Sequence, residues 1–367
     1  MTASQLSCVS ACRHIRARVC ETRRSGLAVS LLSLFAAVSM LAAWTGSTAA
    51  ATGCTPFGNP PQTLVSNPVP LCLGGTLLGP WNDSDGTPRY ACLYMPASAS
   101  PSNRLPLLVW LHPSLVTADS ITSTNILLYQ NNFSLVAGTT GFVVLTPEGR
   151  DTTHFYPAPD NQGPGWDNWY RQFAPGTVNV GGQSYPENVD AATIDHFISL
   201  VQATGNVLTD KTFVSGWSNG SAMSYIYALN RPNVTSIAVY SAPDPFHAFN
   251  DPCPQTPVED NPASIAEIVV PNPGIESYQV HNSCDIAGLC PNSEMIVSQV
   301  ATVGANPDDD VIIDSLKQEV GFCDPLCGTD PDGSSSNLAG TSVGSLNHVE
   351  WPLTWTEQML QFLATHS

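Results

Sequence analysis

The stretch Gly216-Trp217-Ser218-Asn219-Gly220 places a serine between two glycines at the spacing of a nucleophile turn. It follows an apolar run of β-strand length, Thr212 to Ser215, and precedes a helical pattern that includes Met223 and Tyr227. Between a strand and a helix, such a pentapeptide forms a sharp turn that presents the serine Oγ, and the helix dipole favours the oxyanion formed during attack. The sequence therefore predicts Ser218 as a nucleophile, with a Gly-rich β-turn as the simpler alternative.

A serine hydroxyl is a poor nucleophile until a base takes its proton, so an acid and then a histidine should follow it in the chain. His348 stands after the last strand-like segment and just before a C-terminal helical pattern. Among the other histidines beyond Ser218, His247 follows the serine too soon, His281 ends a strand, and His366 is almost terminal. We therefore predict His348 as the base, against the simpler hypothesis of a structural histidine.

Asp285 is the predicted acid because it lies a few residues beyond the strand-like run Ser277 to His281. Catalytic groups of α/β sheets gather beyond the carboxyl ends of strands. The carboxylate would hold the tautomer of the imidazole and stabilise the imidazolium. The alternatives are four clustered aspartates whose pattern is typical of a solvated acidic face, namely Asp308, Asp309, Asp310 and Asp314.

Stabilising the oxyanion requires two backbone N–H groups, and the first should be that of Asn219, directly after the nucleophile. The second should come from the loop after the strand-like run Leu105 to Leu111, where the sequence reads His112-Pro113-Ser114. Proline has no N–H. We therefore predict Ser114 as the second donor and expect His112 to orient the loop.

Strand-type and helix-type patterns alternate around these residues. Apolar runs of strand length also occur at Tyr90 to Met95, Phe142 to Leu145 and Ser236 to Tyr240. Apolar residues repeat with helical spacing at 194, 197, 198 and 201 and again at 355, 359, 362 and 363. This alternation predicts the α/β class, specifically an α/β-hydrolase fold with a mostly parallel central sheet and helices on both faces.

The first fifty residues differ from the rest of the chain. Five of its ten arginines precede a charge-free apolar run from Gly26 to Trp44, which small residues follow. This pattern predicts an export signal over residues 1–50 that is cleaved, giving a secreted, extracellular protein; a retained membrane anchor and lipidation are the alternatives. Residues 51–88 are predicted as an extended Pro- and Gly-rich lead-in held by a disulfide, and residues 89–367 as the catalytic domain.

Charge and cysteine content restrict the partners. The chain has a formal net charge of −18, and after the leader seven basic residues face twenty-nine acidic ones. Nucleic acid is therefore excluded as a partner, and a neutral ester or polyester is favoured over a polyanionic substrate. Eight cysteines follow the leader, which in an exported chain indicates disulfides, with 284 to 290 and 323 to 327 as plausible local pairs. We expect a monomer without membrane attachment after cleavage, and no metal or other cofactor.

From about Arg89 to its end, the chain resembles secreted poly(3-hydroxybutyrate) depolymerases and the related feruloyl and acetylxylan esterases. The matching stretches are Arg89-Tyr90-x-x-x-Tyr94-x-Pro96, Leu105 to His112, Gly141 to Pro147, Gly165-Trp166-Asp167-Asn168-Trp169 and, most specifically, Val214 to Gly220. The chain departs from the family at Pro113, where glycine is usual, at Cys284, where a small residue is usual, and in a His-x-Trp-Pro motif that is one residue longer.

The resemblance implies a Ser218, Asp285, His348 triad and a polyhydroxyalkanoate-type polyester depolymerase. A feruloyl or acetylxylan esterase, a peptidase and a catalytically silent surface-binding protein are the alternatives. Aromatic faces suit an ester-chain cleft, so Trp166, Trp169 and Trp217 are candidate substrate contacts, with core packing as the other interpretation.

Overall fold

The computed structural model describes residues 69–84, 86–151, 164–166, 178–180, 183–185, 188–242, 271–285, 301, 306–323 and 347–366. All of them belong to one compact unit, Ala49–Ser367. The expected export signal and much of the expected lead-in lie outside the described residues, so the signal stays a prediction. Along the described stretches, no helix is both long and apolar enough to cross a membrane.

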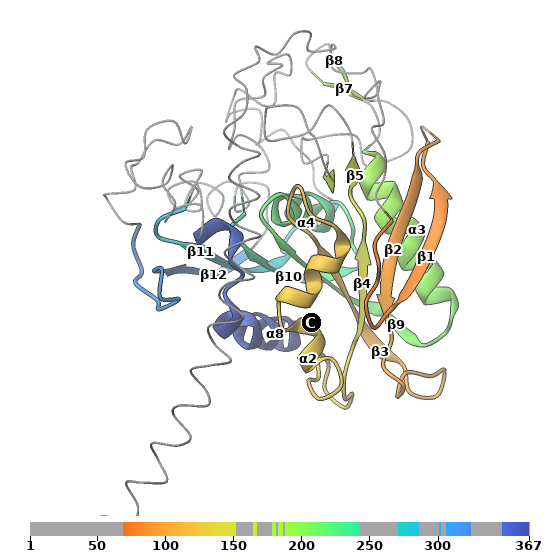
Figure 1. Ribbon diagram of the computed structural model, residues 1–367, viewed down its shortest axis with the longest axis horizontal. Helices are drawn as coiled ribbons and strands as arrows, with labels where there is room; N and C mark the ends of the chain where they lie inside the picture. Colours follow the sequence, from red (N-terminus) through yellow and green to blue (C-terminus); the bar gives the residue numbers. More distant parts are fainter. Residues whose placement is uncertain are drawn as a thin grey trace, which may run out of the picture. The chain divides into compact units, whose positions relative to one another are not determined.

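Eight strands form one sheet (Figure 1) in the spatial order β1 (Thr76–Asn82), β2 (Pro88–Tyr94), β4 (Val143–Pro147), β3 (Leu105–Leu111), β9 (Val207–Trp217), β10 (Val234–Tyr240), β11 (Glu276–Asn282) and β12 (Asn306–Ile313). From β4 to β12 all neighbours are parallel, whereas β2 is antiparallel to both β1 and β4. This strand order, with an antiparallel second strand, is that of the α/β-hydrolase fold, which confirms the predicted fold class.

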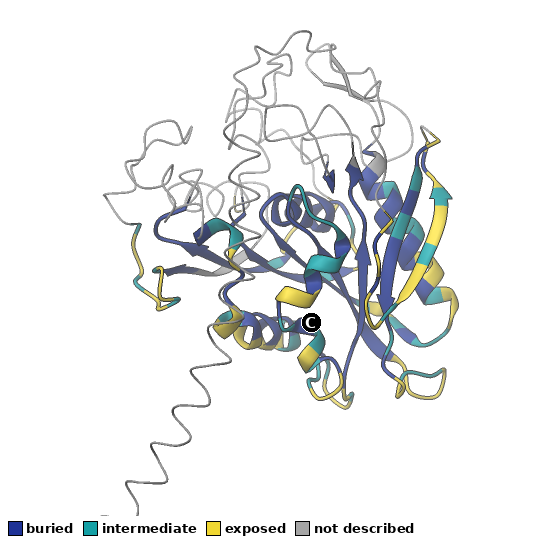
Figure 2. Ribbon diagram, viewed as in Figure 1, coloured by how far each residue is buried: buried dark blue, intermediate teal, exposed yellow. Residues whose placement is uncertain are grey.

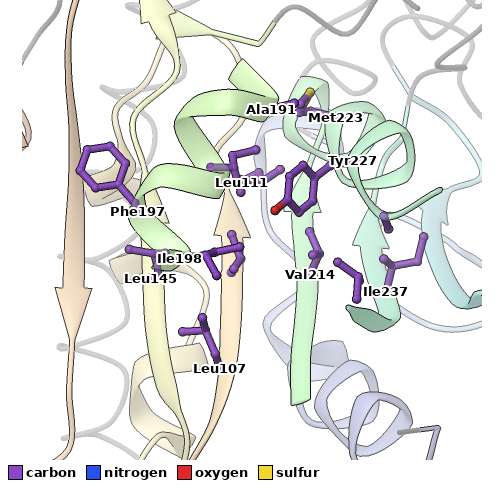
Figure 3. Packing of buried hydrophobic residues seen from close by; sticks show 14 of the residues in the cluster. Leu107, Leu111, Leu145, Ala191, Phe197, Ile198, Val214, Met223, Tyr227 and Ile237 are labelled. Carbon is purple, nitrogen blue, oxygen red and sulfur yellow. The ribbon is translucent and has the colours of Figure 1, made fainter. Parts of the chain in front are cut away.

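Alternate residues of the strands enter two separate cores. In β3, Leu107, Val109 and Leu111 belong to the core that includes α3 (Val189–Ala203) and α4 (Asn219–Leu229). Leu108 and Trp110 belong to the other core, which includes α8 (Thr356–Thr365). Because side chains alternate across a strand, a run that is apolar at every position fits a strand covered on both faces. Figure 3 shows α3 and α4 side chains packed against those of the strands.

The remaining elements are short. They are η1 (Ala118–Ser123), α2 (Ile126–Tyr129), β5 (Arg150–Asp151), β6 (Pro164–Gly165), β7 (Val178–Val180), β8 (Gln183–Tyr185) and η3 (Leu353–Trp355). Of these, β5 to β8 fall in the long loop from Arg150 to Glu187, and they form two small two-stranded sheets.

In the eight-stranded sheet, the structure adds two strands to those expected from the sequence. The first, β1, lies in the stretch expected to be an extended lead-in without regular structure. It forms one edge of the sheet and is largely exposed (Figure 2). Its pairing with β2 is interrupted between Leu78 and Trp81. The second, β12, contains Asp308 to Asp310 and forms the opposite edge. Neither strand has the apolar run from which the other strands are predicted.

A disulfide joins Cys72, just before β1, to Cys92 in β2. This bond fits the expectation that a disulfide holds the lead-in. Cys284 and Cys323 are also disulfide-bonded. Their expected local partners, Cys290 and Cys327, lie outside the described residues.

A group of charged side chains is buried where β2, the end of β4 and the start of α3 meet. Arg89 is fully buried; its Nη1 lies 3.1 Å from Asp83 Oδ2, and its Nη2 donates to Asp190 Oδ1 and, at 3.2 Å, to the carbonyl of Glu148. Arg150 Nη1 lies 3.6 Å from the same Asp83 oxygen. Buried charges are tolerated when they are paired and hydrogen-bonded in this way.

Replacing Arg89 by methionine should destabilise the fold, because it leaves Asp83 and Asp190 buried without this cation. We expect Arg89→Met to lower the free energy of unfolding by about 3–5 kcal/mol, measured by urea denaturation at pH 7. Arg104→Met is the matched control, because Arg104 is exposed, and it should change stability by less than about 0.5 kcal/mol. A loss below about 1 kcal/mol for Arg89→Met would show that the buried pairs are not needed.

Candidate active site

Three neighbouring strands end at one edge of the sheet, and each is followed by a polar residue of interest. Ser218 follows β9 directly, Ser241 follows β10 directly, and Asp285 comes three residues after β11. The three strands are adjacent and parallel, so their carboxyl ends lie side by side. This is the edge at which α/β sheets carry their functional groups.

The turn at Ser218 depends on glycines because backbone segments approach one another closely there. A Cβ on Gly216 would lie 2.4 Å from the carbonyl oxygen of Gly220, and a Cβ on Gly220 would lie 2.2 Å from that of Leu111. Ser218 has φ 55° and ψ −123°, an unusual conformation for a residue other than glycine. Its N–H donates to the Tyr240 carbonyl at 3.0 Å. The packing of α4 against the sheet therefore holds the serine in a strained turn, as predicted for a nucleophile.

The structure brings the three predicted catalytic residues together. Ser218 Oγ lies 2.8 Å from His348 Nε2, and His348 Nδ1 lies 2.8 Å from Asp285 Oδ1. The Asp285 side chain is fully buried, and that of His348 is 15% exposed. With Nδ1–H donating to the carboxylate, Nε2 is free to accept the proton of the Ser218 hydroxyl. The geometry is that required for general-base activation of a serine.

The segments that carry the acid and the base are bonded to each other through residues that precede them. Asn347 Nδ2 donates to the carbonyl of Cys284 at 2.7 Å, and the carbonyl of Asn347 accepts a hydrogen bond from the Tyr240 hydroxyl. Burial raises the pKa of Tyr240 well above its usual value, so this hydroxyl stays protonated and remains a donor. Nothing in the sequence pattern signalled Asn347 or Tyr240, because these contacts join residues far apart in the chain.

The alternative acids considered from the sequence lie within β12 or directly after it. Asp309 is paired with Tyr278 and Asp310 with Gln279, so they lie along β12 before its carboxyl end. Asp314 follows β12, and its Oδ1 accepts the N–H groups of two nearby residues at 2.8 and 3.0 Å, which closes a local turn. The hydrogen bond to His348 is made by Asp285.

For both predicted oxyanion donors, no group of the described residues accepts a hydrogen bond from the backbone N–H. Asn219 is the first residue of α4, so its N–H has no partner within the helix. Ser114 donates no backbone hydrogen bond among the described residues, whereas the next N–H, that of Leu115, donates to the Pro164 carbonyl at 2.7 Å. The contact between Gly220 and the backbone of Leu111 brings the start of α4 next to the strand that leads to Ser114.

Trp166 was expected to line a substrate cleft, and the structure corrects this expectation. Its side chain is fully buried. Its indole Nε1 donates to the His112 carbonyl at 2.8 Å, and its backbone N–H donates to Asn219 Oδ1 at 2.6 Å. The residue therefore joins the loop after β3 to the nucleophile turn and offers no face to a substrate.

The other two candidate cleft residues have different outcomes. Trp217 is 7% exposed, its ring packs against Tyr240 and Trp351, and its Nε1 donates to the His348 carbonyl at 2.9 Å. Core packing and support of the histidine are therefore what this side chain does in the structure. Trp169 lies outside the described residues, and its role stays a prediction.

His112 is held by backbone groups on both ring nitrogens. Gly149 N–H donates to Nε2 at 2.8 Å, so the proton lies on Nδ1 and is donated to the Pro113 carbonyl at 2.8 Å. Complete burial lowers the pKa of His112 to about 4. A neutral ring with both nitrogens occupied fits the expected role of orienting the loop.

His112 should make stability depend on pH. Its pKa is near 6.5 in the unfolded chain and about 4 in the folded one, so between these values the unfolded state binds more protons. The stabilisation is fully present above pH 6.5 and is lost as the pH falls towards 4, by about 3 kcal/mol in total.

The difference between wild type and His112→Gln isolates this contribution. Urea denaturation at pH 7, 5.5 and 4.5 should show the wild type losing more stability on acidification than the variant. Parallel pH curves for the two proteins would contradict the buried neutral histidine.

The comparisons with known proteins concern the fold. No protein-family model matches the chain, and no curated protein is significantly similar to it. Among solved structures, it is similar to a thermostable esterase (14% identity, TM-score 0.43, covering 78% of this chain and 64% of that one). It is also similar to an S-formylglutathione hydrolase from Agrobacterium tumefaciens (11% identity, TM-score 0.46, covering 82% of this chain and 98% of that one). A third similar structure is a putative dipeptidyl aminopeptidase IV from Bacteroides ovatus (12% identity, TM-score 0.45, covering 80% of this chain and 36% of that one). The chain thus spans less than two thirds of the esterase and of the aminopeptidase. The fold follows from the strand order, and the chemistry has to follow from the site.

Proposed function

We propose that this protein is a serine hydrolase that cleaves carboxylic esters through an acyl-enzyme. The observation that carries the proposal is the continuous set of hydrogen bonds from Ser218 Oγ through His348 to Asp285, each 2.8 Å long. His348 Nε2 takes the hydroxyl proton as Oγ attacks the ester carbonyl carbon, and the protonated ring is stabilised by the buried carboxylate.

The tetrahedral oxyanion would be held by the N–H groups of Asn219 and Ser114. When this intermediate collapses, the bond to the alcohol oxygen breaks, and His348 gives its proton to the leaving alcohol. Water, deprotonated by the same nitrogen, then attacks the acyl-enzyme and releases the acid and Ser218. Every proton moves through His348 Nε2, and the steps need no group besides the side chains, the backbone and water.

The conformation of Ser218 supports an enzyme over a catalytically silent binding protein. A backbone conformation as sparsely populated as that of Ser218 costs roughly 1–3 kcal/mol relative to an ordinary one. Such strain is kept where it has a use, and here it directs the hydroxyl to His348. A protein that only binds a surface gains nothing from a serine held in this way.

For the substrate we propose a polyester of the polyhydroxyalkanoate type. The proposal rests on the resemblance of the stretches around Tyr90, Leu108 and Ser218 to secreted depolymerases and on the net charge of −18, which disfavours polyanionic substrates. A feruloyl or acetylxylan ester of a plant polysaccharide is the second candidate, because the same stretches resemble those esterases.

Ser218→Ala should abolish ester hydrolysis. With p-nitrophenyl butyrate, we expect kcat to fall at least about 10⁴-fold, because the variant has no nucleophile to acylate. Ser199→Ala is the control, since Ser199 is exposed on α3 and its hydroxyl donates only to the Asp195 carbonyl. Activity retained in Ser218→Ala, or absent from the wild type, would rule out the proposed mechanism.

The two candidate substrates can be compared directly. The wild type should lower the turbidity of a poly(3-hydroxybutyrate) suspension, Ser218→Ala should not, and release of ferulate from methyl ferulate should be slow. Fast release of ferulate without any clearing would favour the plant-ester alternative. If the protein hydrolyses p-nitrophenyl butyrate but neither clears the suspension nor releases ferulate, the esterase proposal stands and both substrate proposals are rejected.

A further inference from the structure

Ser241 lies between the acid and the base of the proposed triad. It directly follows β10, the strand between β9, which leads to Ser218, and β11, which leads to Asp285. Its Oγ is 2.6 Å from Asp285 Oδ2 and 3.1 Å from His348 Nδ1. The Asp285 carboxylate is thus bonded on one oxygen by the imidazole and on the other by this hydroxyl.

The donors and acceptors allow one arrangement of protons around an ionised Asp285. A carboxylate only accepts, so the Ser241 hydroxyl donates to Oδ2 and the His348 Nδ1–H donates to Oδ1. A lone pair of Ser241 Oγ then faces the same Nδ1–H. With the hydroxyl proton given to Oδ2, both contacts of Nδ1 require the ring proton on that nitrogen, which leaves Nε2 free to accept from Ser218. The hydroxyl therefore favours the tautomer that the proposed reaction needs.

The backbone of Ser241 is also unusual. The residue is fully buried and has φ 55°, a conformation that favours glycine. Its N–H donates to the Val280 carbonyl at 2.8 Å, which ties it to β11 and directs the side chain towards the acid. Glycine would adopt this conformation without steric cost but would lack the hydroxyl.

We infer that Ser241 is a positioning residue of the active site, which orients the Asp285 carboxylate and fixes the tautomer of His348. It acts through these two groups and, being fully buried, does not touch the substrate. The inference rests on the proposed function, because it assigns a further residue to the same reaction. It predicts a loss of kcat with KM unchanged, since only the activation of Ser218 is affected.

The test compares Ser241→Gly with Ser236→Ala. Ser236 is a fully buried serine on β10, the strand that Ser241 follows, and its hydroxyl has no hydrogen-bond partner among the described residues. With p-nitrophenyl butyrate, Ser241→Gly should lower kcat about 10- to 100-fold, the effect expected for the loss of one hydrogen bond to a charged group, and leave KM unchanged. Ser236→Ala should match the wild type. Ser241→Ala gives the same comparison if the glycine variant does not fold.

A spectroscopic measurement separates positioning from a structural role. The proton resonance of the His348 Nδ1–H, assigned by its absence from His348→Ala, should shift or broaden in Ser241→Gly and stay unchanged in Ser236→Ala. A kcat within twofold of the wild type, a change confined to KM, or an unshifted resonance would overturn the inference. If the wild type itself hydrolyses no ester, the proposed function fails; if the wild type is active and Ser241→Gly equally so, only this inference fails.

Discussion

The close contact between the start of α4 and the sheet is the constraint on which the candidate site depends. Gly216 and Gly220 have no space for a side chain, because backbone atoms of Gly220 and of Leu111 would lie within 2.4 Å of an added Cβ. This contact forces a turn of one residue between β9 and α4, and Ser218 is that residue. It also fixes the start of a helix next to the end of β3, so the two predicted oxyanion donors come from neighbouring backbone segments. The turn that carries Ser218 and the two predicted oxyanion donors therefore depend on one packing contact.

Around that contact, buried hydrogen bonds join segments that are distant in the sequence. Trp166 connects the loop after β3 with Asn219, and Asn347 connects the loop before His348 with that before Asp285. Buried polar groups that are fully bonded rigidify their surroundings, since breaking one leaves an unsatisfied group. Such a framework keeps Ser218, His348 and Asp285 at hydrogen-bond distance without help from a substrate.

Most of the central sheet could be predicted, and the two edges could not. Strands β3, β4, β9 and β10 are covered on both faces, so they are apolar at successive positions and stand out in the sequence. The edge strand β1 is largely exposed, and β12 has three aspartates in its first five residues, so neither has that signal. The burial of Trp166 was mispredicted for a related reason: a tryptophan in a Gly-rich loop looks like a substrate contact until the segment that covers it is known.

The sequence by itself determined most of the central strands and singled out Ser218 as the predicted nucleophile, because a strand, two glycines and a helix are adjacent in the chain and their geometry is local. It also provided His348, by its place before the last helix. Only the tertiary structure decided which carboxylate meets that histidine and which residues hold the pair, because Ser241, Asp285 and Asn347 come from three separate segments. Their hydrogen bonds depend on the order of the strands in the sheet, and that order places side by side residues that no spacing in the sequence connects.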